Sequence, residues 1–470
     1  MRRAYAALLA LCLGLLGALA TAGPAQAAPQ TLTNGTQFKD TSGNPVHAHG
    51  GGVLKVGSYY YWFGEHRNAD NTFRYVDAYR STDLKNWEFR NHVLTEASDP
   101  ELGTANIERP KVMYNAATGK FVMWMHKENG TDYSEARAAV AVSDTVDGNY
   151  TWKGSFRPLG QHMSRDITVF VDTDGAGYMI SAARENYDLQ IYRLTADYTG
   201  IASLVANPWP GGHREAPALF KRGGVYFMLT SGATGWNPNQ QQYATATSIG
   251  GPWSAMKNIG DSTAYGSQTA FVLPVQGTSG TSYLYLGDRW GNSFNGTVND
   301  SRYVWLPLTF SNSTTMAMSW SPEVTIDTAA GTVTGTSATY NTLIARHSSK
   351  CADVTSQSLW AGAQLKQYDC NGGTNQKYWF KSVGSGYYQL MVRNSSLCVQ
   401  ENASTVTQEN CASSATSQQW SLTTTGSYVN VKSRASGECL DVNGASTANG
   451  AALITYTCNG GTNQQWTRGT

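Results

Sequence analysis

Short apolar stretches, each bounded by glycine, asparagine or aspartate, recur through the first two thirds of the chain. Five of them begin with a polar residue, at positions 48–54, 107–112, 165–170, 215–220 and 267–272. Further strand-like runs follow each start, and no convincing amphipathic helix intervenes. A repeat of about 50 residues with several strands per unit is typical of a β-propeller, so we predict an all-β domain, a five-bladed β-propeller, over residues 28–335.

The polar residues at these five starts define a candidate site. They are separated by 59, 58, 49 and 53 positions and are His49, Glu108, Asp166, Glu215 and Gln268. The innermost strands of a propeller line its central channel, so residues at equivalent starts converge at one end of it. Three carboxylates in equivalent places predict acid–base chemistry, whereas a single Asp or Glu at a strand edge is usually a turn residue.

The last third of the chain contains a threefold repeat over residues 343–380, 387–422 and 428–468. Each copy holds one cysteine in its first half, a second one 13 or 19 positions later, and a glutamine-rich end. The predicted disulfide pairs are Cys351–Cys370, Cys398–Cys411 and Cys439–Cys458. Units of about 40 residues cannot each bury a core, so we expect the copies to close one domain together, at 343–470, after a linker at 336–342.

The N-terminus is expected to be a signal peptide over residues 1–27. Arg2 and Arg3 precede an apolar run at 6–20, and residues 25–27 have the small-x-small pattern of a cleavage site. A membrane anchor is the alternative, although the run is short for a bilayer. Cysteine usage agrees with export, because six of the seven cysteines lie between Cys351 and Cys458. We therefore predict a secreted, extracellular protein.

Composition narrows the range of partners. The net charge is +1 and only 14% of residues are charged, which argues against nucleic acid or an anionic surface as partner. The 14 Trp and 26 Tyr fit both an all-β core and surfaces on which sugars stack. The clustered cysteines contain no C-x-x-C pair and no histidine at ligand spacing, so we predict no metal site. We also predict that the protein needs no cofactor and is a monomer.

The first two thirds of the chain resemble glycoside hydrolase family 43. The motifs that carry this resemblance are Ser-Thr-Asp-Leu-Lys-Asn-Trp at 81–87, Ser-Arg-Asp at 164–166 and Arg-Glu-Ala-Pro at 214–217. Within the family, Ala-His-Gly-Gly-Gly at 48–52, Tyr-Tyr-Trp-Phe-Gly-Glu at 60–65 and Glu-Arg-Pro-Lys at 108–111 resemble the exo-β-1,3-galactanases. The Gln-x-Trp motif, repeat number and cysteine spacing of the last third resemble ricin-type β-trefoil lectins and family 13 carbohydrate-binding modules.

The resemblance implies an inverting hydrolysis with divided roles. Glu215 corresponds to the general acid, and the apolar neighbours Ala216 and Pro217 favour a raised pKa. Asp166 corresponds to the residue that orients the acid and adjusts its pKa. Most of the family place an aspartate base near the first start, where this chain has His49.

The general base is therefore left open between three residues. In galactanase-like members the resemblance implies that Gln268 holds the nucleophilic water, with its imidic-acid form as one route to base catalysis. An ordinary amide is a very poor base, which makes Glu108 the second candidate and His49 the third.

Other candidates concern substrate binding. Glu65 follows an aromatic strand and either binds sugar hydroxyls, together with His49, or pairs with Arg67 or Arg109. Trp236 and Trp290 lie in glycine-flanked loops, where an indole can stack on a pyranose or pack in the core.

The trefoil resemblance implies two competent sugar sites. The residues it matches in the first repeat are Asp353, Tyr368, Asn375 and Gln376, and those in the third are Asp441, Tyr456, Asn463 and Gln464. The second repeat has Gln400, Glu409 and Ser417 at the corresponding places, so we expect it not to bind sugar.

These observations predict a secreted exo-β-1,3-galactanase that hydrolyses the β-1,3-galactan backbone of arabinogalactan with inversion. An α-L-arabinofuranosidase or β-xylosidase of the same family is one alternative, disfavoured by the missing aspartate base. A non-catalytic galactan-binding lectin is the other, and the retained Glu215 and Asp166 argue against it.

Overall fold

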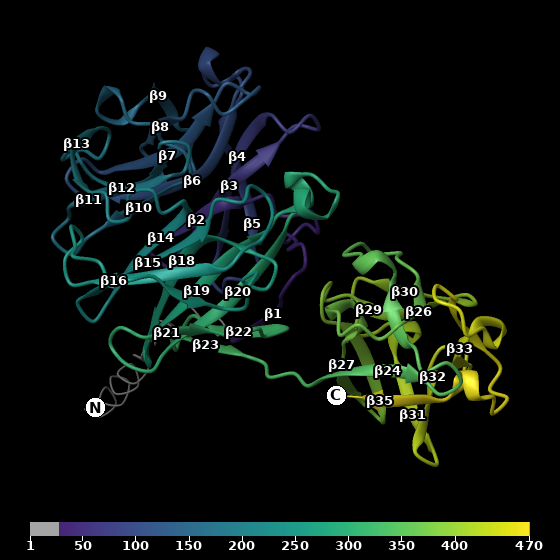
Figure 1. Ribbon diagram of the computed structural model, residues 1–470. Coiled ribbons are helices and arrows are strands. Elements are labelled where there is room, and N and C mark those ends of the chain that lie inside the picture. The colour runs from purple at the N-terminus through teal and green to yellow at the C-terminus, as the bar shows by residue number, and fades with distance from the viewer. Residues whose placement is uncertain (1–27, 470) are drawn as a thin grey trace, which may run out of the picture.

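The computed structural model describes residues 28–469, and the predicted signal peptide at 1–27 lies outside this range. Figure 1 shows two bodies, the first in purple to green and the second in green to yellow, joined by an extended segment between β23 (Thr332–Gly335) and β24 (Tyr340–Ala345). Both bodies are built from strands, which confirms the all-β class. No helix within residues 28–469 is long and apolar enough to cross a membrane.

The first body contains five four-stranded antiparallel sheets in chain order. The first sheet holds β2 (His49–Val56), β3 (Tyr59–Arg67), β4 (Phe73–Ser81) and β5 (Glu88–Thr95). The second holds β6 (Asn106–Asn115), β7 (Lys120–Glu128), β8 (Arg137–Ser143) and β9 (Thr151–Phe156). The third holds β10 (Ile167–Val171), β11 (Gly177–Ala183), β12 (Asp188–Leu194) and β13 (Ile201–Ala206). The fourth holds β14 (Arg214–Arg222), β15 (Val225–Gly232), β16 (Gln241–Ala246) and β17 (Lys257–Ile259), and the fifth β18 (Gln268–Gly277), β19 (Gly280–Arg289), β20 (Arg302–Phe310) and β21 (Met316–Met318).

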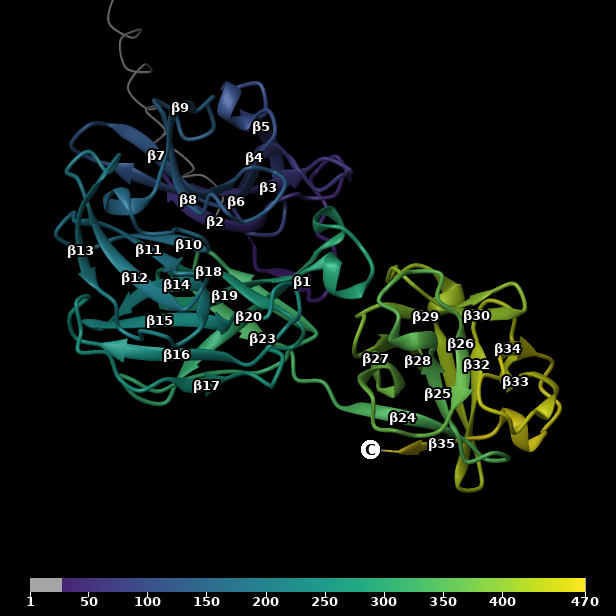
Figure 2. The same cartoon turned by 45° about the horizontal axis from the view of Figure 1, so that its top comes forward.

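The first strand of each sheet lies at the centre of this body. These strands contact one another in the cyclic order β2, β6, β10, β14, β18 and back to β2. Figure 2 shows their labels gathered in the middle, whereas β5, β9, β13 and β17 lie at the edge. The arrangement is propeller-like, and it brings residues that are some fifty positions apart to one central channel.

The two ends of the ring are fastened together by pairing and by packing. The N-terminal strand β1 (Gln30–Thr33) pairs with β22 (Glu323–Asp327), which pairs with β23. Between the first and fifth sheets, the rings of Trp62 and Trp305 lie 5.0 Å apart and those of Trp62 and Trp87 lie 5.1 Å apart. All three indoles are at most 2% exposed, so this aromatic cluster contributes several kcal/mol of burial energy to ring closure, at about 1.5–3 kcal/mol per large side chain.

The second body is one twelve-stranded sheet that closes into a barrel when β24 pairs with β35. Its other strands are β25 (Cys351–Val354), β26 (Leu365–Tyr368), β27 (Tyr378–Gly384), β28 (Tyr387–Val392), β29 (Cys398–Asn402), β30 (Thr405–Glu409), β31 (Trp420–Thr425), β32 (Tyr428–Ser433), β33 (Cys439–Val442), β34 (Leu453–Tyr456) and β35 (Trp466–Gly469). The motif tryptophans Trp420 and Trp466 are fully buried in its core. The predicted disulfides Cys351–Cys370, Cys398–Cys411 and Cys439–Cys458 are all confirmed.

Short 3-10 helices occupy several connections. Within the described residues they are η1 (Pro100–Leu102), η2 (Pro158–Gly160), η3 (Gly291–Phe294), η4 (Val298–Asp300), η5 (Thr355–Gln357), η6 (Thr374–Gln376), η7 (Thr416–Gln418), η8 (Asn443–Ala445) and η9 (Thr462–Gln464). In the barrel, η6, η7 and η9 carry the glutamine of each repeat's end motif. One turn of each of these helices therefore presents the motif side chains to the preceding strands.

Candidate active site

A pocket of about 360 Å³ opens at the end of the central channel. Most of the sequence-predicted residues lie together in its wall, which is formed by Glu65, Glu108, Arg109, His126, Tyr133, Arg165, Asp166, Glu185, Asn186, Glu215, Ala233, Gly235, Trp236, Gln268 and Trp290. Four of the five strand-start residues line it, and His49 does not. The structure thus brings four of the five strand-start residues together at one pocket, as the spacing of the repeats predicted.

Bulges at the strand starts aim these side chains into the pocket. The pairing register shifts directly after Glu108 and after Glu215, and the next residues, Arg109 and Ala216, both have a φ of +51°. The equivalent residue after His49 is Gly50, with a φ of +62°. A Cβ on Gly50 would lie 2.4 Å from a carboxylate oxygen of Glu65, so only glycine fits there. A bulge re-aims a side chain without ending the strand.

Glu215 is a buried acid whose proton is retained at neutral pH. Burial, reinforced by the negative charge of Asp166, raises the pKa of Glu215 to about 8, although Arg109 partly offsets this. Its Oε1 accepts a hydrogen bond from Gln268 at 3.0 Å, and its Oε2 accepts one from Asn186 at 3.0 Å. A carboxylic acid that is neutral at pH 7 and open to a pocket can donate a proton to a leaving oxygen.

Arg109 and Asp166 form the link between the acid and the rest of the site. Arg109 Nε lies 2.8 Å from Asp166 Oδ1, while the backbone amide of Ala216 donates to Asp166 Oδ2 at 2.9 Å. Asp166 therefore holds the backbone next to Glu215 and places a negative charge near its carboxyl group. Arg109 also donates to Gln268 Oε1 at 2.6 Å, so it connects residues at the starts of the third and fifth sheets to the second sheet.

The side-chain amide of Gln268 is held by four hydrogen bonds. Its oxygen accepts from Arg109 at 2.6 Å and from the indole of Trp290 at 2.7 Å. Its nitrogen donates to Glu215 at 3.0 Å and to Ser231 at 2.9 Å. Both donors of the amide and two acceptor positions are thus occupied. The arrangement fixes the amide rigidly beside the acid, and two strong donors at the oxygen disfavour its protonation.

Glu108 is an ionised carboxylate surrounded by donors. Its Oε1 accepts from Arg67 at 2.8 Å and from Tyr133 at 2.7 Å, and its Oε2 lies 3.1 Å from His126 Nδ1. Burial opposes ionisation, but the hydrogen bond from His126 and the charge of Arg67 outweigh it and hold the pKa of Glu108 well below its usual range. Such a carboxylate is a weak base, which counts against Glu108 as proton acceptor.

His126 is the charged partner of Glu108. Its ring is buried, with Nε2 2.7 Å from Glu128 Oε1, and Glu128 is itself fully buried. Burial alone would lower the pKa of His126, yet hydrogen bonds to Glu108 and Glu128 raise it to about 9. The ring is therefore an imidazolium at neutral pH that keeps Glu108 anionic.

Glu65 forms the predicted pair with Arg67 and also lies in the pocket wall. It lines the pocket, and it also accepts from Arg67 at 2.7 Å and from the backbone amide of Arg109 at 3.1 Å. Its side chain is 2% exposed, and burial raises its pKa. An ion pair fixed in this way can present a carboxylate oxygen to a sugar hydroxyl at little entropic cost.

His49 is not part of the pocket wall. Its ring is fully buried, lies 3.1 Å from Asp288 through Nδ1, and stacks on Tyr303 at 4.6 Å between centroids. The prediction that His49 contacts substrate does not fit this position, and neither does a role as base, because the ring lies against Asp288 and Tyr303 of the fifth sheet.

Trp236 and Trp290 both line the pocket but differ in burial. Their rings meet edge to face at 5.2 Å. Trp290 is 4% exposed and uses its indole nitrogen to hold Gln268, whereas Trp236 is partly exposed. Trp236 is thus the better placed of the two to offer a ring face to a sugar.

A second set of polar residues faces the strand starts, and of these only Glu65 was a candidate from the sequence. Each lies directly opposite a strand-start residue on the next strand of the same sheet, and the pairs are His49–Glu65, Glu108–His126, Glu215–Ser231 and Gln268–Asp288. The signal was present, because each partner follows its strand start by 16 to 20 positions, the length of one hairpin. Asn186 and Tyr133 come from loops, where no period points to them.

Two clusters of residues have the composition of cation ligands. Glu108, His126 and Asp166 form one, and His66, Asp77 and His92 form the other. Within each cluster the ligand atoms lie within 4.8 Å of one another. In the first cluster the carboxylates of Glu108 and Asp166 form ion pairs with Arg67 and Arg109, so the protein itself supplies positive charge to them.

The barrel brings the predicted sugar-site residues together in repeats one and three. Asp353 Oδ2 accepts from Asn375 at 2.9 Å and from Gln376 at 2.8 Å. The corresponding bonds in the third repeat are equally short, from Asn463 at 2.8 Å and from Gln464 at 2.9 Å to Asp441. Tyr368 and Tyr456 are 46% and 53% exposed beside these clusters. In the second repeat the amide of Gln400 replaces the aspartate and bonds Gln418 at 2.9 Å.

The site combines a protonated carboxyl, an adjacent carboxylate and an indole wall at the end of a propeller-like channel. This combination is that of a glycoside hydrolase, and comparison with known proteins agrees. The model of glycosyl hydrolases family 43 matches residues 43–272, and that of the ricin-type beta-trefoil lectin domain matches residues 339–466. The chain belongs to glycosyl hydrolase family 43 and carries a ricin-type lectin domain.

Several solved structures are similar over most of the chain. An exo-beta-1,3-galactanase from Clostridium thermocellum is 47% identical, with a TM-score of 0.66, covering 93% of this chain and 99% of that one. An exo-beta-1,3-galactanase from Phanerochaete chrysosporium, solved with beta-1,3-galactotriose, is 29% identical with a TM-score of 0.64 and covers 93% and 92% of the two chains. A beta-agarase from Agarivorans albus is 36% identical over 59 residues, and the match spans only 13% of its length.

Proposed function

We propose that this protein is a secreted exo-β-1,3-galactanase acting on the galactan backbone of arabinogalactan. The observation that carries the proposal is the pairing of Glu215, an acid with a pKa of about 8, with Gln268 at 3.0 Å, in a chain 47% identical to an exo-beta-1,3-galactanase. Incubating the purified protein with β-1,3-galactan, xylan and arabinan tests it. Release of galactose from the first substrate only is the expected result.

In the proposed mechanism Glu215 protonates the leaving oxygen. Asp166 keeps the pKa of Glu215 high and holds the adjacent backbone through Ala216. Gln268, whose amide oxygen is held by Arg109 and Trp290, uses its amide nitrogen to position the attacking water once substrate displaces the contact with Glu215. The proton that this water loses on attack passes to solvent. Trp236 and Glu65 bind the sugar, and Glu108 binds a hydroxyl as a fixed anion.

We further propose that each of the five sheets is one blade of a five-bladed propeller. The mature chain is proposed to begin at Ala28.

Inversion is expected when the sugar and the water enter between Glu215 and Gln268, which are in contact at 3.0 Å without substrate and must separate to roughly 6.5–9.5 Å to admit them. Proton NMR of the first-formed galactose should show the α anomer before mutarotation. Initial appearance of the β anomer would contradict the mechanism, since retention requires a nucleophile that Gln268 cannot supply.

The barrel is proposed to bind galactan through two sites, in repeats one and three. Asp353→Ala and Asp441→Ala should each weaken apparent affinity for long-chain galactan about ten-fold or more, because linked sites act through effective concentration, and the double change should nearly abolish binding. Gln400→Ala in the second repeat is the matched control and should bind normally. Unchanged binding of the double variant to insoluble galactan would place the contacts elsewhere.

A galactan-binding lectin without hydrolysis is the second candidate function. The four hydrogen bonds that hold Gln268 favour it, because they leave the amide poorly suited to accept a proton. Binding of galactan without release of galactose in the same assay would support this candidate over the first.

A further inference from the structure

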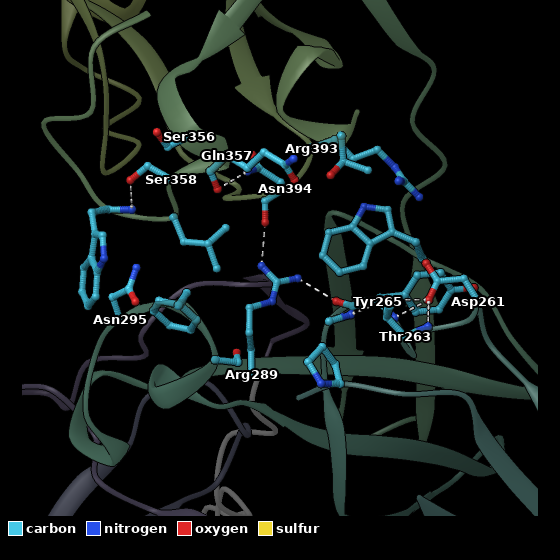
Figure 3. Close-up of a pocket in the computed structure, with 18 residues that line it drawn as sticks. Asp261, Thr263, Tyr265, Arg289, Asn295, Ser356, Gln357, Ser358, Arg393 and Asn394 are labelled. Atoms are coloured by element: carbon cyan, nitrogen blue, oxygen red, sulfur yellow. Dashed lines mark hydrogen bonds between the residues drawn. The ribbon is translucent and has the colours of Figure 1, made fainter. Parts of the chain in front are cut away.

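A second pocket, of about 570 Å³, lies between the two bodies. Tyr265, Arg289 and Trp320 line it from the propeller side, and Gln357, Arg393 and Asn394 line it from the barrel side. Figure 3 shows Arg289 at its centre, bonded to the backbone oxygens of Asn394 at 2.7 Å and Tyr265 at 2.8 Å. The contact fixes the two walls relative to each other and leaves the space between them open.

This interdomain pocket adjoins the catalytic pocket through two shared loops. One loop places Trp236 in the catalytic pocket and Pro238 in the interdomain pocket. The other places Trp290 in the catalytic pocket and Ser293 and Phe294 in the interdomain pocket. The two loops thus form part of the wall of both pockets.

The same pocket also adjoins the first sugar site of the barrel. Ser356 and Gln357 belong to η5, which directly follows the strand that carries Asp353. Thr374 lines the pocket and directly precedes Asn375, whose side-chain oxygen is buried and has no hydrogen-bond partner within the described residues. The interdomain pocket thus lies between two sites that are both proposed to bind galactan.

Arg393 offers a free guanidinium to this pocket, unlike its counterparts in the other repeats. Arg346 and Arg434 occupy the equivalent position, and each donates to the glutamine that ends a repeat motif, Gln465 and Gln419. In the repeat of Arg393 the position of those glutamines is occupied by Lys377, whose ammonium group cannot accept a hydrogen bond. Within residues 28–469 the Arg393 side chain forms no hydrogen bond or ion pair, so its donors remain available.

Other groups in the pocket suit a sugar. Arg289 is 6% exposed, and its Nε has no partner among the described residues. The indole of Trp320 is partly exposed in the wall, with the Arg289 guanidinium 5.9 Å from its ring. Convergent donors beside an aromatic face are the usual composition of a carbohydrate subsite.

We propose that the interdomain pocket is a carbohydrate subsite that holds the part of a β-1,3-galactan chain extending from the catalytic pocket toward the first barrel repeat, an inference that rests on the proposed function. Arg393 donates to hydroxyl oxygens of the chain, Arg289 holds the two walls in place through its backbone contacts, and Trp320 supplies the apolar face. A short substrate occupies the catalytic pocket alone, whereas a long one also fills this subsite.

Hydrolysis kinetics of the full-length protein on a β-1,3-linked galactose disaccharide and on a long β-1,3-galacto-oligosaccharide test the subsite. Arg393→Ala should lower kcat/KM for the long substrate about ten-fold, mainly through KM, because a charged hydrogen bond is lost, and should leave the disaccharide unaffected. Arg434→Ala, the equivalent change away from the pocket, should behave like the wild type on both substrates. Arg393→Gln serves if the alanine variant does not fold, with thermal unfolding monitored for each.

Wild-type kinetics of Arg393→Ala on the long substrate would overturn the subsite and leave the proposed function intact. An equal loss on both substrates would also overturn it, since that pattern indicates a general disturbance. Failure of the wild type to hydrolyse either substrate would instead overturn the proposed function, and the subsite with it.

Discussion

Glu215→Gln is expected to lower turnover by about 10²–10⁴-fold while the protein stays folded. The amide keeps the size of the side chain and its neighbours Gln268 and Asn186, but it has no acidic proton for a poor leaving group. Initial rates of galactose release from β-1,3-galactan measure the effect. Glu135→Gln, on a partly exposed acid outside the pocket, is the matched control and should keep normal turnover.

The pH dependence of the wild type follows from the same group. Because the folded pKa of Glu215 is raised to about 8, its catalytic protonated form predominates below pH 8 and is lost above it. Activity should therefore fall on the basic side near that value, and Asp166→Asn should move the fall to lower pH by removing the nearby negative charge. Activity of Glu215→Gln within about three-fold of the wild type would remove Glu215 from the mechanism.

Gln268→Ala is expected to lower turnover by about 10²-fold or more, because a displaced nucleophile costs that much even when the other groups are intact. The change removes the amide and also frees the donors of Arg109 and Trp290 that face it. Added azide, a small anion that those freed donors can hold, should restore part of the turnover. Product analysis should then reveal a galactosyl azide.

Glu108→Ala provides the comparison. With Glu108 held as a weakly basic anion by Arg67, Tyr133 and His126, its loss should raise KM and should not be rescued by azide. Rescue of Glu108→Ala, together with near-normal kinetics of Gln268→Ala, would transfer the role of base to Glu108.

The sequence determined much of the site, because a repeated fold repeats its positions. Glu108, Asp166, Glu215 and Gln268 were identified from one spacing rule, and the structure brings all four to one pocket. The disulfides followed in the same way, from cysteine positions within each repeat, whereas the predicted sugar-site residues of the barrel came from the resemblance to ricin-type lectins.

The spacing rule failed at His49, and the reason is local. Each of these strands has a polar residue at or near its start, but a spacing of about fifty does not say which neighbours that residue will pack against. Because Gly50 has no side chain, the carboxylate of Glu65 occupies the space that a Cβ at position 50 would fill. The ring of His49 packs on Tyr303 and not in the pocket wall. In the pocket wall, Glu65 on β3 thus occupies the place that was expected for His49 on β2.

What the sequence determined by itself is therefore the class of fold, the covalent links and which residues share a position in each repeat, since these depend on periodicity and short-range pattern. Only the tertiary structure decided the charges. The pKa of Glu215 near 8 arises from burial and from the charge of Asp166, and the anionic state of Glu108 arises from His126 and Arg67, groups that lie on other sheets or on neighbouring strands. Electrostatic energies depend on distance and burial in space, and neither quantity is a function of separation along the chain.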